Sequence, residues 1–225
     1  MRERWGVERE RQDTRYRLSF TVGGLLMPQG VMCARCFVDS HPQPDAPDVP
    51  VGEAIVSIRD EVVDANMLAI RTVSANRRVT AEVCKRLSAL SYAELALLAS
   101  DALSPQDRRY LMWIAMCRYY LFVGEFASEV LHERFLLGET ICHADYDRFM
   151  LNKALWHPEL ESVSAATASK LRGNVFKAMR EAGLVEGDPR GVCSIVPAVF
   201  GRSLAALEGP GSASLLFFPS RGPMN

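Results

Sequence analysis

The sequence predicts a mainly α-helical protein of two packed helical subdomains, the second ending in a winged-helix-like unit of one helix and a β-hairpin. Apolar residues recur at spacings of three and four along most of the chain, as on the buried face of a helix. Ser residues precede these segments and Gly residues follow several of them, which is typical of helix starts and stops. The chain has 225 residues and 48% are hydrophobic, enough for a substantial core. We expect a flexible tail over 1–14, subdomains over 15–100 and 101–208, and a C-terminal tail over 209–225.

The first subdomain begins with a short strand or turn over 15–26, which breaks at Gly23 and Gly24 and leads into a helix. Ser74 is a suitable N-cap for the helix that ends this series, because a Ser hydroxyl can accept a hydrogen bond from a free N–H of the first turn. The expected elements are a helix over 29–38, a proline-rich loop over 40–50, and helices over 51–59, 61–70 and 75–90.

Capping residues mark the starts of the later helices. Ser91 and Glu94 have the spacing of a capping box. Ser104 precedes Pro105, and Pro is favoured at the first helical position. Ser164 can cap the last long helix, which Gly183 ends in a left-handed conformation. The expected helices cover 91–100, 105–123 (apolar nearly all round, and therefore central), 125–137, 143–155 and 165–182.

Composition excludes several classes of protein. Lys and Arg number 26 against 27 Asp and Glu, so the net charge of -1 excludes a strongly basic, histone-like protein. No apolar run is long enough for a transmembrane helix, and the N-terminus has no signal-peptide core. We therefore expect a cytoplasmic protein with reduced thiols and no membrane contact.

Motifs for catalysis, cofactors and metals are missing from the sequence. It holds no phosphate-binding glycine loop, no nucleophile elbow and no histidine pair at metal-binding spacing. Cys33 and Cys36 have the spacing of one half of a zinc site or of a redox pair, but no second close pair accompanies them. The alternative is two small apolar residues on a helix. We expect no enzyme activity, no cofactor and no metal.

Charge is segregated along the chain. Segment 38–64 has a net charge of -6, whereas 71–90 has a net charge of +4. On the helix over 75–90, the basic residues lie opposite the apolar ones, so this helix can present a basic face. The alternative is a solvated surface paired with the acidic segment. The basic residues are Arg71, Arg77, Arg78 and Lys85.

The helix over 165–182 has a second basic face. A β-hairpin over 184–196 follows it at once, with Arg190 at the tip. This is the layout of a winged helix-turn-helix, in which the recognition helix enters the major groove and the wing touches the backbone. Lys and Arg would contact phosphates, while Arg172 and Asn174 could read base edges. The predicted DNA-binding residues here are Lys170, Arg172, Asn174, Lys177, Arg180 and Arg190.

Several spaced stretches resemble the BrxA family of bacterial BREX (bacteriophage exclusion) defence systems. They are RYRLSFTVGGLL (15–26), SYAELALLA (91–99), MWIAMCRYYLFVGEFASEVLHERF (112–135), DYDRF (145–149) and WHPELESVSAATASKLRGNVFKAMREAGLV (156–185). The resemblance covers roughly residues 15–200 and implies a mostly helical fold, once likened to NusB-type antitermination factors. It also implies a non-enzymatic, nucleic-acid-binding member of a system that contains a methyltransferase, an ATPase and a phosphatase-like protein.

The first hypothesis is therefore a double-stranded DNA-binding BREX component, with a monomer favoured. A second is an adaptor that binds other BREX proteins and uses apolar pieces near Trp156 and 215–218 for docking, although we expect Trp156 to pack in the core. A third is an RNA-binding, antitermination-like protein. The resemblance brings no catalytic motif, and the DNA-binding residues come from the charge pattern alone.

Overall fold

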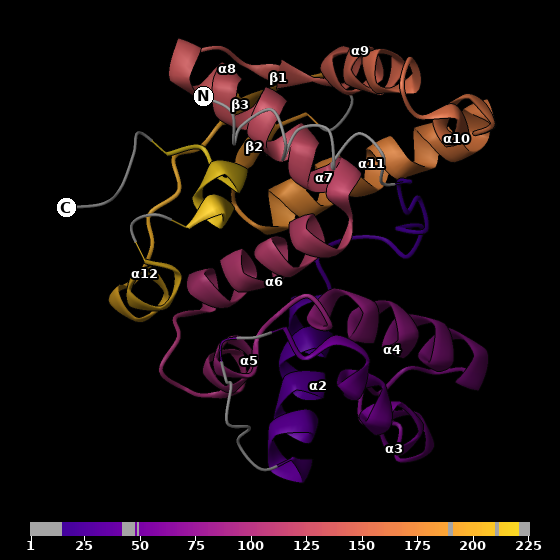
Figure 1. Cartoon of the computed structure of the whole chain (residues 1–225), viewed down its shortest axis with the longest axis vertical. Coiled ribbons are helices and arrows are strands. Elements are labelled where there is room, and N and C mark those ends of the chain that lie inside the picture. Colours follow the sequence, from indigo (N-terminus) through magenta and orange to yellow (C-terminus); the bar gives the residue numbers. More distant parts are fainter. Residues whose placement is uncertain (1–14, 42–47, 49, 189–190, 210–211, 221–225) are drawn as a thin grey trace, which may run out of the picture.

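A computed structural model describes residues 15–41, 48, 50–188, 191–209 and 212–220. The predicted tail over 1–14 lies outside the described residues. The chain is mostly helical, and a small antiparallel sheet lies near its end (Figure 1). The elements of the first half are α2 (Met27–Ser40), the 3-10 helix η1 (Gly52–Ile58), α3 (Arg59–Asp64), α4 (Val73–Leu87), α5 (Tyr92–Ala99) and α6 (Pro105–Tyr119). The second half contains α7 (Leu121–Phe126), the π-helix η2 (Ala127–His132), α8 (Glu133–Leu137), β1 (Ile141–Cys142), α9 (His143–Ala154), α10 (Pro158–Glu161), α11 (Ala165–Glu181), β2 (Val185–Gly187), β3 (Val192–Ile195), α12 (Arg202–Glu208) and the 3-10 helix η3 (Ala213–Phe217).

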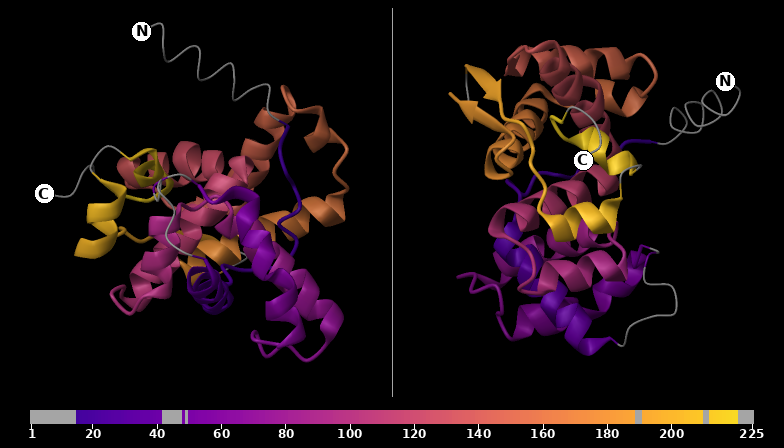
Figure 2. Two further views of the ribbon diagram at one scale, coloured as in Figure 1. Left: turned by 60° about the horizontal axis from the view of Figure 1, so that its bottom comes forward. Right: turned by 90° about the vertical axis from the view of Figure 1, so that its left-hand side faces the viewer.

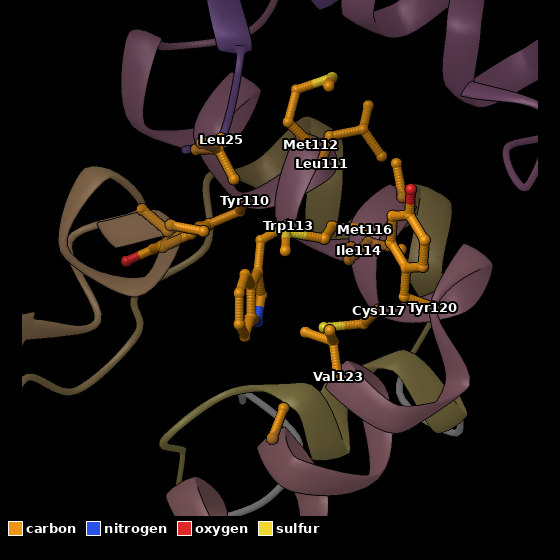
Figure 3. Packing of buried hydrophobic residues seen from close by; sticks show 14 of the residues in the cluster. Leu25, Tyr110, Leu111, Met112, Trp113, Ile114, Met116, Cys117, Tyr120 and Val123 are labelled. Atoms are coloured by element: carbon orange, nitrogen blue, oxygen red, sulfur yellow. The ribbon is translucent and has the colours of Figure 1, made fainter. Parts of the chain in front are cut away.

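Helix α6 is the centre of the core, as its apolar sequence predicts. Figure 1 shows α2 to α5 on one side of it, and α7 to α11 with the sheet on the other. Seven consecutive residues, from Leu111 to Cys117, are buried, so α6 is covered on all sides (Figure 3). The Trp113 indole N–H donates to the Phe217 carbonyl oxygen at 2.9 Å. The two predicted subdomains therefore share one continuous hydrophobic core.

The central helix ends earlier than predicted. We expected it to run to about Val123 and to break at Gly124, but α6 ends at Tyr119 and α7 begins at Leu121. Tyr120 lies between them outside the helical region, at φ -103° and ψ 88°, with its ring fully buried. Because the Tyr120 hydroxyl donates to both carboxylate oxygens of Glu82 on α4, a tertiary contact holds the break at this residue.

Several predicted helix ends are confirmed and one is wrong. Ser91 and Glu94 form the expected capping box, and the Ser104 and Ser164 hydroxyls accept from the N–H groups three residues on. The predicted cap Ser74 is wrong, because Thr72 caps α4 instead and Ser74 lies within its first turn. Gly183 has a φ of +71°, as a left-handed helix stop requires.

The hairpin after α11 belongs to a three-stranded antiparallel sheet of order β1-β3-β2. Its third strand, β1, was not predicted from the sequence. Ile141 pairs with Cys193, and Val185 pairs with Ile195. The chain therefore runs from β1 through α9, α10 and α11 into the hairpin, whose strands lie at the edge of the molecule (Figure 2).

The C-terminal region folds back onto the core. Residues 213–217, which we expected to belong to a tail, form η3 and pack beside α6 and η2. Phe218 is fully buried, and its carbonyl oxygen lies 2.6 Å from Nδ1 of His132. The segment over 15–26 contains no strand, but Phe20 and Leu25 anchor it in the same core.

Candidate nucleic-acid interface

Helix α11 has the two faces that its sequence predicts. Leu171, Val175 and Met179 are fully buried, so this side fixes the helix on the core. Lys170 and Lys177 are exposed on the other side, two turns apart. Gly173 is exposed between them, and a Cβ at this position would have no heavy atom within 4 Å. The protein's own packing therefore does not require a glycine there.

Two of the predicted base-reading residues contact the protein itself. Arg172 forms an ion pair with Asp147 on α9. Asn174 donates from Nδ2 to the Phe20 carbonyl oxygen at 2.9 Å, which ties α11 to the N-terminal segment. Both side chains are half-buried. Their spacing along the helix gave no sign of these partners, which lie 25 and 154 residues away.

The C-terminal half of α11 lines a cavity of about 530 Å³ together with the start of α2 and with Arg109 of α6. Lys177 and Arg180 lie in its wall. The Nη1 atom of Arg180 is buried without a hydrogen-bond partner in the described structure. Glu181 reduces the positive charge here, because its carboxylate lies 3.7 Å from the Lys177 Nζ.

His143 lies behind this basic region, with its ring edge against Phe176. Burial lowers the pKa of His143, and the positive charges of Arg172 and Arg180 lower it further. The carboxylates of Asp147 and Asp188 oppose this effect, so burial is the main reason for the lowered pKa.

Arg190, predicted at the hairpin tip, lies outside the described residues. Glu186 and Asp188, which flank the tip on the β2 side, are exposed. The contribution of Arg190 remains a prediction from the sequence.

Helix α4 exposes all the basic residues assigned to it, Arg77, Arg78 and Lys85, and Arg71 is exposed just before it. In the part of the chain that the structure describes, no ion pair joins these side chains to the acidic segment 38–64. The alternative that the acidic segment pairs with this basic face therefore has no support among the described residues.

Arg86, on the other side of α4, is completely buried. Its guanidinium pairs with Glu82 at 2.9 Å and donates to the carbonyl oxygens of Val22, Gly24 and Leu25. From α11, Glu181 accepts the Leu25 N–H at 2.5 Å. Both basic helices therefore hold the same turn of the N-terminal segment.

The two apolar pieces proposed for docking differ in exposure. Trp156 is 68% exposed, contrary to our expectation that it packs in the core. Leu155, which directly precedes Trp156, and Leu151, about one helical turn before Leu155, are both more than 70% exposed. Most of 215–218 instead lies against the core, and only Leu216 is largely exposed.

The described residues form neither a metal-binding cluster nor a membrane-spanning helix. Within the described ranges, no group of three or more His, Cys, Asp or Glu side chains is placed to hold a metal ion. Cys33 and Cys36 are buried in α2. None of the helices in the same ranges has the length and apolar character needed to cross a bilayer.

The fold is similar to that of a solved protein. The crystal structure of an uncharacterized protein from Magnetospirillum magneticum superimposes with a TM-score of 0.69, covering 87% of this chain and 92% of that one. The two sequences are 14% identical, so this similarity concerns the fold alone.

Sequence comparison identifies a family. A curated relative, named BREX protein BrxA, from Escherichia coli O9:H4 (strain HS), is 26% identical over 129 residues. That match spans 57% of this chain and 60% of the relative. The BrxA family model matches residues 14–205. This match extends from the segment before α2 to α12, and the chain therefore belongs to the BrxA family.

Proposed function

We propose that this protein binds double-stranded DNA, with the exposed face of α11 in the major groove and the β2–β3 hairpin beside it on the backbone. The main support is the order of elements: a strand, two helices separated by the short α10, and a hairpin whose second strand lies centrally in a sheet of order β1-β3-β2. Winged-helix domains have this order, and in helix-turn-helix proteins the second helix of the pair is the one that contacts base edges.

The exposed side chains of α11 suit this role. Lys170 lies in the N-terminal half of the helix, which is the part that enters the groove in helix-turn-helix complexes. Gly173 costs helix stability relative to Ala, and its open surroundings leave room for close approach of another molecule. Arg71, Arg77, Arg78 and Lys85 would add phosphate contacts if the DNA extends along α4.

The experiment is a fluorescence-anisotropy titration of a labelled duplex at several salt concentrations. The variant Lys170→Glu/Lys177→Glu should bind more weakly, and its log–log salt slope should be shallower by about 2 units, about one per lost phosphate contact. Arg202→Glu is the control for the effect of reversing a surface charge elsewhere. Arg202 is exposed on α12, and α12 lies away from the start of α11 (Figure 1). Unlabelled single-stranded DNA and RNA serve as competitors. Equal affinities and slopes for wild type and the double variant would exclude this surface.

We further propose that the protein acts as a non-enzymatic component of a BREX system, in the cytoplasm, together with other BREX proteins. Membership of the BrxA family and the printed name of the curated relative support this role. Genomic neighbourhood tests it directly, because the gene should then lie among those of a BREX system.

An adaptor function has support from a separate observation. Large apolar side chains are exposed at the C-terminal end of α9, on Leu151, Leu155 and Trp156. Single exposed apolar residues are common on protein surfaces, whereas a cluster of them is typical of an interaction site. Replacing Leu155 and Trp156 with Ser should leave folding intact and reduce co-purification with the other BREX proteins. Full retention of those proteins by the Ser variant would argue against the adaptor.

A further inference from the structure

A second concave site lies on the N-terminal half of the molecule. It is a cavity of about 750 Å³, within the size range of small-molecule sites. Three basic side chains from three separate elements line it: Arg17 from the extended N-terminal segment, Arg59 from the start of α3, and Lys85 from α4. Only Lys85 belongs to the basic face predicted from the sequence. The fold therefore gathers cations that are far apart in the chain.

These cations differ from most of the other basic residues near concave surfaces. Lys177 and Arg134, which line two other cavities, each have a carboxylate within 4 Å. Within the described part of the chain, no ion pair involves Arg17, Arg59 or Lys85. Like charges held near one another without ion-paired carboxylates repel one another, and a bound anion would reduce that repulsion.

Contacts around the cavity hold part of this arrangement in place. The Arg17 guanidinium lies 4.8 Å from the centre of the Tyr119 ring, in a cation–π contact. The Cys84 thiol also lines the cavity. A hydrogen bond with Cys33 is the main cause that lowers the pKa of Cys84, burial opposes it, and the positive charge of Arg59 contributes a smaller lowering.

The rim leaves space for a ligand. Gly52 has a φ of +58°, and a Cβ built there would have nothing within 4 Å. Its N–H donates to the Ser88 carbonyl oxygen at 3.1 Å, which closes one side of the cavity. Glu53 is the single acidic residue among those that line it, so the net charge of the lining is positive.

We propose that this cavity binds a phosphate group of a nucleotide or of a nucleic-acid backbone through Arg17, Arg59 and Lys85. Phosphate suits the site because guanidinium groups bind its oxygens with two parallel hydrogen bonds and an ammonium group adds a point charge. The cavity is larger than one phosphate needs, which leaves room for the attached nucleoside. The site does not include α11 and shares only Lys85 with the DNA-binding surface proposed above, so ATP binding in the cavity is tested separately from DNA binding by α11.

Isothermal titration calorimetry on the full chain tests the proposal, with ATP and inorganic pyrophosphate as probes of free phosphate compounds. The variant is Arg59→Glu/Lys85→Glu. The matched control is Arg148→Glu/Arg202→Glu, which makes the same charge change at two exposed residues that neither line the cavity nor belong to the predicted DNA-binding residues. We expect the cavity variant to bind ATP at least about 10-fold more weakly than wild type and the control variant to bind normally.

A second arm identifies the source of the phosphate. If neither ATP nor pyrophosphate binds wild type, the salt slope of duplex binding should become shallower in the cavity variant by about one unit more than in the control, which assigns the phosphate to the DNA backbone. If neither small-probe binding nor the duplex slope depends on these residues, the proposal is wrong. If the α11 variant binds duplex DNA as wild type does, the proposed function of α11 is wrong. The ATP result still stands in that case, because the cavity does not include α11.

Should the double variant fail to fold by circular dichroism, Val56→Glu replaces it. Val56 is a half-exposed cavity residue, and this change adds a carboxylate to the lining without removing a described contact. The same losses are expected, and unchanged binding of every probe overturns the proposal.

Discussion

Replacing Arg86 with Met should destabilise the protein more than any surface change on the same helix. Arg86 has no exposed surface, and its partner Glu82 is 3% exposed. Removing the guanidinium leaves the Glu82 carboxylate in the core with only the Tyr120 hydroxyl as a donor among its described contacts. It also removes the donors for three carbonyl oxygens of the 22–25 turn.

The magnitude follows from the loss of one partner of a buried pair, which costs about 3–5 kcal/mol. A domain of this size loses roughly 2–4 °C of melting temperature per kcal/mol, so Tm should fall by about 6–20 °C. Urea unfolding followed by circular dichroism gives the free energy of unfolding, and a thermal scan gives Tm.

Two further variants make the result specific to the buried pair. Arg77→Met, on the exposed side of α4, should change the free energy of unfolding by less than about 0.5 kcal/mol. Glu82→Met in the Arg86→Met background should recover part of the loss, because it removes the unpaired charge. If Arg86→Met unfolds at the same urea concentration as Arg77→Met, then Arg86 does not stabilise the 22–25 turn.

Two other changes test the surface of α11 and the attachment of the N-terminal segment. Gly173→Ala should raise the free energy of unfolding by about 1 kcal/mol in urea titrations, since Ala is the better helix former and its methyl group meets open space; a loss of stability would show that the glycine is needed for packing. Burial opposes ionisation of Glu159, but the hydrogen bond from the Tyr16 N–H and the neighbouring His157 lower its pKa below 4.5. A lowered pKa means that the folded state binds fewer protons, so this contribution to stability is present above pH 4.5 and is lost as the pH falls through the folded-state pKa. Glu159→Gln should therefore be less stable than wild type at pH 7 and lose less stability on acidification, as measured by urea midpoints at pH 7 and about pH 4; parallel losses in both proteins would contradict the assignment.

Helix starts could be predicted from the sequence where a cap depends on neighbouring residues. The N-caps at Ser91, Ser104 and Ser164 form because each hydroxyl accepts from a backbone N–H three residues further on, which is a local geometry. At α4, Thr72 and Ser74 are both competent caps. The choice between them depends on where the preceding turn places the chain, and the sequence does not show this.

Long-range contacts account for the elements that were missed. Strand β1 is two residues long and exists because Ile141 and Cys142 pair with β3, some 50 residues later. The break at Tyr120 depends on Glu82 of another helix. Neither contact leaves a periodic signal in the local sequence, because such a signal requires several turns or alternations.

The basic residues of the candidate nucleic-acid interface could be predicted from the sequence, but the residues that they contact within the protein could not. The alternation of apolar and basic residues correctly placed Lys170 and Lys177 on the exposed side of α11. The sequence did not show that Arg86 is buried while Lys85, one residue earlier, is exposed, because both lie in the same basic segment. Arg59 was hidden in a segment whose net charge is negative, so a sum over the segment concealed its part in the cavity.

Most of the contacts that α11 makes with the N-terminal segment and α6 lie toward its C-terminal end, whereas the earlier part pairs with α9 through Arg172 and Asp147. Toward its C-terminal end, Asn174 and Glu181 hold the backbone of the N-terminal segment, and Gln106 of α6 donates to the Ala182 carbonyl oxygen. Glu181 also places a carboxylate near the start of α2, where no side chain caps the helix and the partial positive charge of its N-terminus favours an acid. The negative charge beside Lys177 therefore has a structural reason. Lys170 and Gly173, in the earlier part of the helix, have no such role, which agrees with a recognition helix that enters the groove by its N-terminal half.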